Sequence, residues 1–295
     1  MGLSMRAPAK INLFLHVAPP RPDGYHELEA LAAFTEFGDR LSVEAGTDLR
    51  LEIAGPFAAA LESDRADNIV LRATRRLLDD VSADRRVGLG ATLRLEKNLP
   101  VASGIGGGSS DAAAALRLLA AHWSVEIPPE DLDKLALELG ADVPVCLHSR
   151  TAWMSSIGDR VEPAPALPPM GVVLVNPQVA VSTRDVYRAL DTRIADTHRF
   201  AALARPGQWA GFSDLIDFLR QQRNDLELPA IGLAPPIADV LETLAANDAA
   251  LARMSGSGAT CFGLFARQSD ADAAADRIRR RRPDWWVVAT QFKTD

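Results

Sequence analysis

Four glycines within the five residues Gly104–Gly108 follow a predicted strand and open a predicted helix, and this loop constrains the fold more than any other segment. Glycine lets a ligand approach backbone N–H groups closely, and the following helix offers unpaired N–H groups and the positive end of its dipole. Ser109 and Ser110 add hydroxyl donors. The segment therefore predicts a site for a di- or triphosphate. A flexible turn capped by serine is the alternative.

The spacing of the glycines separates the phosphate-binding loops from one another. No Lys-Ser or Lys-Thr pair follows the last glycine, so the segment is not a Walker A loop. Gly104 and Gly106 fit a dinucleotide-binding fingerprint, and Glu126 lies where a ribose-binding acid is expected, but Ser109 stands at the third glycine position. This near match keeps a dehydrogenase open as an interpretation. It is less favoured, because Ser124–Ile127 is a poor second strand.

Composition excludes several classes of protein. With 47% hydrophobic residues, the 295-residue chain is too apolar for a disordered one. Its apolar runs are too short for a membrane span, and no signal peptide is visible, so we expect a cytoplasmic protein without a membrane partner. The net charge of −7 argues against a nucleic-acid partner. A protein of this charge must hold an anion by local means, and Lys10 is the expected nearby cation.

The predicted strands and helices do not alternate regularly along the chain, which favours an α+β fold over a doubly wound sheet. The segments expected to pair as a hairpin are Leu41–Glu44 and Leu49–Ile53. The other predicted strands are Ala9–Val17, Gly90–Glu96, Val172–Val175, Thr260–Phe265 and Trp286–Thr290. The predicted helices are Asn68–Leu78, Ser109–His122, Glu130–Leu139, Thr183–Leu190, Ser213–Arg223, Ile237–Ala246 and Asp270–Arg281. Four prolines in Pro163–Pro169 predict a connector, and hence domains at residues 1–162 and 163–295.

Polar residues in apolar company mark further candidates. Lys10 and Asn12 share one face of the first strand; the face is either solvated or partly buried, and a partly buried lysine needs an anion. Asp142 lies between Ala141 and Val143, either bridging a loop backbone or serving as a general base.

Two turns add to these candidates. Tyr25 and His26 follow the turn Arg21–Gly24, as a surface hairpin or as the rim of a pocket. Met254–Phe262 is a second glycine–serine loop before a strand. The five histidines show no metal-binding spacing.

Three ordered segments, Ala7–Leu13, Pro100–Ala113 and Met254–Cys261, together resemble the GHMP kinase superfamily of galactokinase, homoserine kinase and mevalonate kinase. Arg21–His26 and Gly140–Pro144 are most similar to the branch that phosphorylates a CDP-linked polyol. The resemblance spans nearly the whole chain. It implies a two-domain α+β fold, with an N-terminal domain like ribosomal protein S5 domain 2, a ferredoxin-like C-terminal domain, and an active site in the cleft between them.

The resemblance also implies an activity and its residues. Asp142 would be the catalytic base, accepting the proton of a substrate hydroxyl that attacks the γ-phosphate of ATP, with Lys10 as its cationic partner. The substrate would be held by Asn12, Tyr25, His26, Thr183 and Tyr187. ATP would be bound by the loop residues Pro100, Val101, Ala102, Ser103, Gly104, Ile105, Gly106, Gly107, Gly108, Ser109 and Ser110.

The implied reaction phosphorylates the 2-hydroxyl of the CDP-linked polyol in the non-mevalonate isoprenoid pathway. Mg²⁺ is expected with ATP, but its protein ligands are not placed. The partners would be these small molecules, and the chain a monomer or weak homodimer. A kinase of homoserine or of a mevalonate-type substrate stays open. So does a non-catalytic nucleotide-binding regulator, against which the retention of Lys10 and Asp142 argues.

Overall fold

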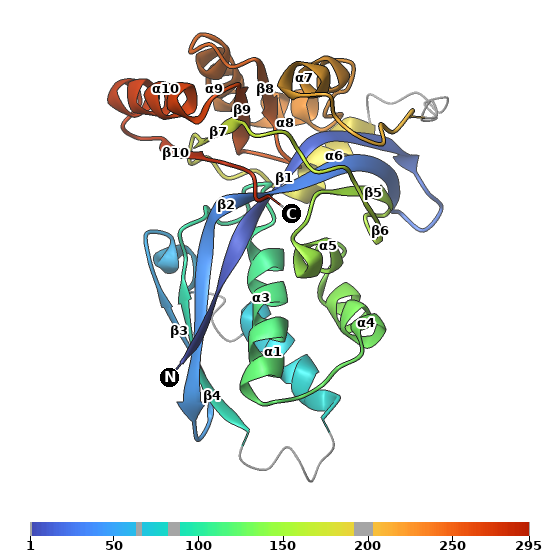
Figure 1. Ribbon diagram of the computed structural model, residues 1–295, viewed down its shortest axis with the longest axis vertical. Helices are drawn as coiled ribbons and strands as arrows, with labels where there is room; N and C mark the ends of the chain where they lie inside the picture. The colour runs from blue at the N-terminus through green and yellow to red at the C-terminus, as the bar shows by residue number, and fades with distance from the viewer. Residues whose placement is uncertain (1, 63–66, 82–88, 192–202, 295) are drawn as a thin grey trace. The chain divides into compact units, whose positions relative to one another are not determined.

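The structure, a computed structural model, describes residues 2–62, 67–81, 89–191 and 203–294 (Figure 1). Contacts divide the chain into two compact units that interleave along the sequence. β1 (Leu3–Pro20) and β2 (His26–Gly46) pair with each other and contribute to both units. The first unit comprises Met1–Ala9, Gly38–Val101 and Gly106–Ser149, and the second Lys10–Phe37, Ala102–Ile105 and Arg150–Asp295. The predicted domain boundary between residues 162 and 163 stays a prediction.

The first unit combines a sheet with helices grouped around α3. The bounds are β3 (Leu49–Ala54), η1 (Ala58–Leu61), α1 (Ile69–Asp79), β4 (Gly90–Glu96), α3 (Gly107–His122), α4 (Pro129–Leu139) and α5 (Val143–His148). Helices α1, α4 and α5 all pack against α3 (Figure 1). Asn68 starts α1 where a helix was predicted, since its side chain accepts the Val70 N–H at 2.9 Å. The glycine loop runs directly into α3, as expected.

The predicted hairpin is wrong. β4 lies between the two strands, parallel to β3 and antiparallel to residues 40–46 of β2. Gly90 allows this insertion, because a Cβ at this position would lie 2.1 Å from the carbonyl oxygen of Gly46. Strand patterns indicate which residues extend, but the partner of a strand depends on residues far away in the sequence.

The second unit contains two sheet regions. Residues 28–32 of β2 pair with β5 (Ala152–Ser156), which pairs with β6 (Arg160–Pro163). The other region is antiparallel in the order β10-β7-β9-β8. Its strands are β7 (Gly171–Asn176), β8 (Leu251–Met254), β9 (Cys261–Phe265) and β10 (Trp286–Thr290).

The helices of this unit complete its topology. They are α6 (Thr183–Asp191), α7 (Phe212–Arg220), α8 (Glu227–Leu233), α9 (Pro236–Ala245) and α10 (Gln268–Arg281). α10 packs on β7 and β10, and α9 on β8 and β9 (Figure 1). Helices between β7 and β8, the β8–β9 pair, and α10 before β10 give the split βαβ order of a ferredoxin-like fold. The α+β prediction is therefore confirmed.

β1 is buried on both of its faces in its central part. Lys10 is 3% exposed, Asn12 4% and His16 8%, alongside a fully buried Phe14. The solvated-face interpretation of Lys10 and Asn12 is therefore wrong, because the strand is covered on both sides. Within the described residues, no helix is long and apolar enough to cross a membrane.

Candidate active site

Met254–Cys261, the third of the ordered segments, is called the third motif. Within the second unit it meets the first strand and the part of the glycine loop that belongs to this unit. The Oγ of Ser255 accepts the backbone N–H of Asn12 at 3.0 Å and donates to the carbonyl oxygen of Gly104 at 2.9 Å. The Lys10 N–H donates to the carbonyl oxygen of Ile105 at 2.9 Å. Ser255 is fully buried. Three segments that are distant in the sequence are therefore held together by one serine and its neighbours.

Glycine is required where the loop passes the third motif. Gly104 has a φ of +77°, and a Cβ there would lie 2.3 Å from the carbonyl oxygen of Ser255. A Cβ at Gly256 would lie 2.7 Å from the carbonyl oxygen of Gly104. The Thr260 N–H also donates to the carbonyl oxygen of Ser103 at 3.0 Å. The two glycine-rich loops therefore touch backbone to backbone, which explains why both are glycine-rich.

In the first unit, the glycine loop ends at the start of α3. Gly106 is the N-cap of α3 in a left-handed conformation, with a φ of +63°. The buried hydroxyl of Ser110 donates to the carbonyl oxygen of Pro8 at 2.6 Å, so it anchors the helix start rather than facing solvent. The helix offers its N-terminal N–H groups there, as the sequence predicts for an anion.

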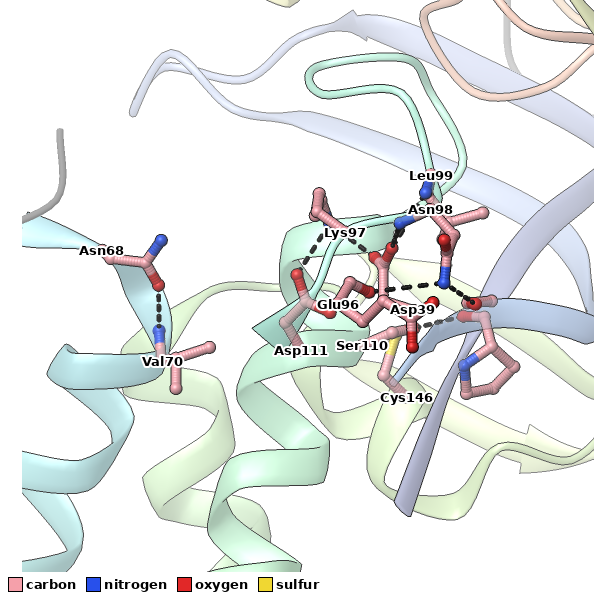
Figure 2. Close-up of polar contacts among 12 residues, drawn as sticks. Asp39, Asn68, Val70, Glu96, Lys97, Asn98, Leu99, Ser110, Asp111 and Cys146 are labelled. Atoms are coloured by element: carbon pink, nitrogen blue, oxygen red, sulfur yellow. Dashed lines mark hydrogen bonds and ion pairs between the residues drawn. The ribbon is translucent and has the colours of Figure 1, made fainter. Parts of the chain in front are cut away.

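A buried charge cluster beside the start of α3 was missed by the sequence prediction. The ammonium of Lys97 donates to Asp39 Oδ2 at 2.5 Å and to Asp111 Oδ2 at 2.7 Å (Figure 2). These side chains are at most 3% exposed. Their spacing hid the cluster, because Lys97 lies 58 positions from Asp39 and 14 from Asp111.

Asp111 and Lys97 have shifted pKa values. Burial raises the pKa of the Asp111 carboxyl to about 7; the ammonium of Lys97 opposes the shift, and the nearby Asp39 adds to it. Burial alone would lower the pKa of Lys97, but the two carboxylates raise it above its ordinary value. Lys97 is thus a cation next to the loop in addition to the expected Lys10.

Asp142, the predicted base, belongs to the first unit, whereas Lys10 belongs to the second. Asp142 precedes α5 as its N-cap residue, yet its side chain makes no capping hydrogen bond. The carboxylate is half-buried rather than enclosed. The sequence analysis assigns no helix to Val143–His148, yet Pro144 fits the first turn of α5, a position that proline tolerates. The short helix fixes the backbone on the carboxyl side of Asp142.

The predicted substrate residues form a second group in the second unit. The rings of His26 and Tyr187 have centroids 4.9 Å apart. His26 donates from Nδ1 to the carbonyl oxygen of Ala18 at 2.8 Å, and its Nε2 lies 3.4 Å from Asp191 Oδ1. Tyr187 lies on α6.

Two further predicted residues lie at the edges of this group. The hydroxyls of Thr183 and Ser257 are 2.8 Å apart, which links α6 to the third motif. Tyr25 is 60% exposed, and its backbone N–H donates to Asp23 Oδ1 at 3.1 Å. The structure therefore brings together His26 and Tyr187, and places Tyr25 at the surface.

The strand β8 is tied to β1 by a buried arginine that the sequence prediction did not single out. Arg253 donates to the carbonyl oxygens of Leu13, Leu219 and Gln222 at 2.7–2.8 Å. Burial lowers its pKa to about 10, with Glu227 opposing the shift. Arg253 thus makes charge-assisted hydrogen bonds to three carbonyl oxygens, and the bond to Leu13 fixes β8 to the strand that carries Asn12.

No group of three His, Cys, Asp or Glu side chains that could hold a metal ion occurs in the part of the chain that the structure describes. In the first unit, the start of α3 offers backbone N–H groups that suit an anion, and Asp142 adds a carboxylate. In the second unit, His26 and Tyr187 add an aromatic pair. These are the kinds of group that transfer of a phosphoryl group from a nucleotide to an alcohol requires.

Family models match both halves of the chain. The model of the GHMP kinases N terminal domain matches residues 68–150, and that of the GHMP kinases C terminal domain matches residues 200–284. Curated relatives match over nearly the whole length. The 4-diphosphocytidyl-2-C-methyl-D-erythritol kinase of Bradyrhizobium diazoefficiens is 48% identical over 289 residues, covering 95% of each chain. That of Cereibacter sphaeroides is 50% identical over 292 residues, covering 97% of this chain and 98% of its own.

Solved structures resemble the whole chain as well. A crystal structure of 4-(cytidine 5'-diphospho)-2C-methyl-D-erythritol kinase matches with a TM-score of 0.76 and 34% identity, covering 99% of this chain and 100% of that chain. A homoserine kinase from Cytophaga hutchinsonii matches with a TM-score of 0.72 but 17% identity, over 99% of this chain and 95% of that chain. This second likeness concerns the fold alone. The predicted two-domain GHMP kinase fold is therefore confirmed.

Proposed function

This chain belongs to the 4-diphosphocytidyl-2-C-methyl-D-erythritol kinases of the GHMP kinase superfamily, and from that premise we propose that it transfers the γ-phosphoryl group of ATP to the 2-hydroxyl of 4-diphosphocytidyl-2-C-methyl-D-erythritol. The products are the 2-phosphate and ADP, a step of the non-mevalonate isoprenoid pathway. The observation that carries the proposal is the joining of the Lys10–Asn12 strand, Gly104 and Ser255 by hydrogen bonds.

We propose that Asp142 is the catalytic base. Asp142 lies at the start of α5 and is partly exposed, and a carboxylate that a substrate can reach is able to accept the proton of the attacking hydroxyl. We propose that Lys10 neutralises charge that develops on the transferring phosphoryl group, since its backbone N–H is bonded to Ile105 of the glycine loop and an ammonium stabilises such charge. Positioning and electrostatics supply most of the catalysis in phosphoryl transfer.

The glycine loop, Pro100–Ser110, is the proposed binding segment for ATP. Gly104 and Gly106 hold left-handed conformations that leave the backbone N–H groups free of side-chain cover. The dipole of α3 adds positive potential at its first turn. This explains how a chain with a net charge of −7 binds a polyanion by local means.

We propose that the cytidine part of the substrate is recognised by His26, Tyr25 and Tyr187, and that Asn12 and Thr183 contact its polar groups. A ring pair 4.9 Å apart gives a platform beside which a flat base can stack. The bond between Thr183 and Ser257 supports this proposal, because it connects the same group of residues to the third motif.

Mg²⁺ is proposed to accompany ATP, where it would neutralise phosphate charge when bound. The protein ligands of the ion are not assigned in this proposal. A cytoplasmic location and a monomer or weak homodimer complete the proposal.

A substrate panel tests the proposed function. Purified protein is incubated with Mg-ATP and, separately, with 4-diphosphocytidyl-2-C-methyl-D-erythritol, mevalonate phosphate or homoserine, and ADP release is followed. We expect ADP only with the CDP compound. ADP with homoserine or mevalonate phosphate instead would assign another GHMP kinase activity, and nucleotide binding without ADP release would favour a regulator.

A further inference from the structure

The buried cluster of Lys97, Asp39 and Asp111 contacts both ends of the glycine loop. The two ends are the residues that lead into the loop after β4 and the first turns of α3, and both belong to the first unit. Asp39 Oδ1 accepts the backbone N–H groups of Asn98 at 2.5 Å and Leu99 at 2.8 Å, directly after β4 ends (Figure 2). Asp39 Oδ2 accepts the ammonium of Lys97. One carboxylate of β2 therefore fixes the residues that lead into the loop.

The same ammonium reaches the far end of the loop. Lys97 donates to Asp111, which lies four residues after Gly107 and so on the same face of α3. A Cβ at Gly107 would lie 3.1 Å from the Lys97 nitrogen, so the ammonium lies against the first turn of this helix. Lys97 thus connects the segment before the loop to the helix after it.

The backbone of Lys97 is fixed as firmly as its side chain. Its N–H donates to the carbonyl oxygen of Ala54 at 2.7 Å, and its carbonyl accepts the Phe57 N–H at 3.2 Å. A Cβ at Gly55 would lie 2.7 Å from the carbonyl oxygen of Lys97. The backbone and the ammonium of Lys97 are therefore both held by hydrogen bonds, and the three side chains of the cluster form a clamp.

We propose that Lys97, Asp39 and Asp111 are positioning residues that hold the glycine loop in its nucleotide-binding conformation. The proposal rests on the proposed function, which assigns the loop to ATP. A loop whose two ends are fixed loses less conformational entropy when a ligand binds. Buried ion pairs contribute little net stability compared with apolar residues of similar volume, so fixing the loop is a reason for these charges that stability alone does not give.

The oxygen Oδ1 of Asp111 has no hydrogen-bond partner within the described residues, although the side chain is buried. An unpaired buried carboxylate oxygen is costly, so stability alone would favour an apolar side chain at this position. Burial also raises the pKa of Asp111, which is consistent with a proton held in the clamp near neutral pH.

Substitution of Asp111 tests the clamp. We expect Asp111→Leu, which cannot accept from Lys97, to raise the dissociation constant of ATP about tenfold, the size of one lost charge-assisted hydrogen bond. Calorimetric titration with a non-hydrolysable ATP analogue measures it. We expect Asp111→Asn to stay close to wild type, since its amide oxygen still accepts the ammonium. Thr74→Val is the matched control, because it removes a buried hydroxyl bond of α1 outside the clamp.

The outcomes separate the clamp from the proposed function. Wild-type protein that does not bind the analogue overturns the proposed function. Wild-type binding together with unchanged binding by a folded Asp111→Leu variant overturns the clamp alone, as does a loss equal to that of Thr74→Val. If Asp111→Leu does not fold, Asp39→Asn serves instead, because its amide still accepts the two N–H groups but presents an NH₂ to Lys97. The same tenfold rise is expected for it, and unchanged binding again overturns the clamp.

Discussion

The Oγ of Ser255 accepts the backbone N–H of Asn12 at 3.0 Å, although the two residues are 243 positions apart in the sequence. The same hydroxyl donates to Gly104, so one buried serine fixes the first strand and the glycine loop relative to each other. Both bonds lie within the second unit.

Substitution of Ser255 by alanine removes both bonds and leaves two buried polar groups without this partner. We expect a loss of about 2–5 kcal/mol in the free energy of unfolding, and a rise in the KM values for both substrates. Denaturant unfolding and steady-state kinetics measure these effects. Thr74→Val controls for the loss of a buried hydroxyl elsewhere. KM values equal to those of the control would show that the serine has no positioning role.

Asp142→Asn removes the proposed base and keeps the shape of the side chain. We expect kcat to fall by about 10²–10⁴, the usual size of general-base catalysis, with KM values little changed. The half-exposed position predicts an unchanged melting temperature. Asp133→Asn is the control, since this residue is an exposed carboxylate on α4 that faces His148. Retention of wild-type kcat by Asp142→Asn would remove Asp142 from the mechanism.

Tyr187 and His26 are predicted to recognise the CDP compound through their rings. We expect Tyr187→Leu to raise the KM for the CDP compound about three- to tenfold, because the stacking contribution of an aromatic pair is of that size, and to leave the KM for ATP unchanged. Tyr187→Phe keeps the ring and should retain most of the affinity. An equal rise in both KM values would indicate general disruption of α6 rather than lost recognition.

Sequence patterns predicted elements whose signal is local. The strands Gly90–Glu96 and Trp286–Thr290 were predicted with the bounds that the structure shows, because alternation and flanking turns define them within a few residues. The helix Asn68–Leu78 was placed within one residue, since Asn68 caps it through its own side chain. Local chemistry decides such features.

Features that depend on distant partners were not predictable. The pairing of β2 and β3 with β4 was missed. β4 comes much later in the sequence than the other two strands and inserts between them, which a local pattern does not reveal. The cluster at Lys97 was missed, because its carboxylates come from β2 and α3. The burial of Lys10 was likewise not predictable, because the alternation of residues within β1 does not tell whether its polar face is also covered.

Gly104 is predicted to be intolerant of any side chain. Gly104→Ala would combine a φ of +77° with a Cβ 2.3 Å from the carbonyl oxygen of Ser255. We expect loss of ATP binding, measured by calorimetry. Gly24→Ala is the matched control, since its φ is +83° but no atom lies within 4 Å of the added Cβ. That variant should show only the strain of the left-handed conformation, about 1–2 kcal/mol. Equal effects of the two substitutions would mean that the contact with the third motif is unimportant.

The stability of the protein is predicted to depend on pH through Asp111. Its pKa is about 7 in the folded state and 3.8 as the ordinary value, so between these values the folded protein holds a proton that the unfolded chain has released. Because the slope of the unfolding free energy with pH follows the difference in bound protons, stability falls as pH rises through this window and is level above about pH 7. Asp111→Asn has no such proton to lose. The melting temperature of wild type minus that of Asp111→Asn should therefore decrease from about pH 5 to about pH 7 and then stay constant, as circular dichroism at a series of pH values measures. A difference that is constant across the window would show that Asp111 is ionised in the folded state throughout.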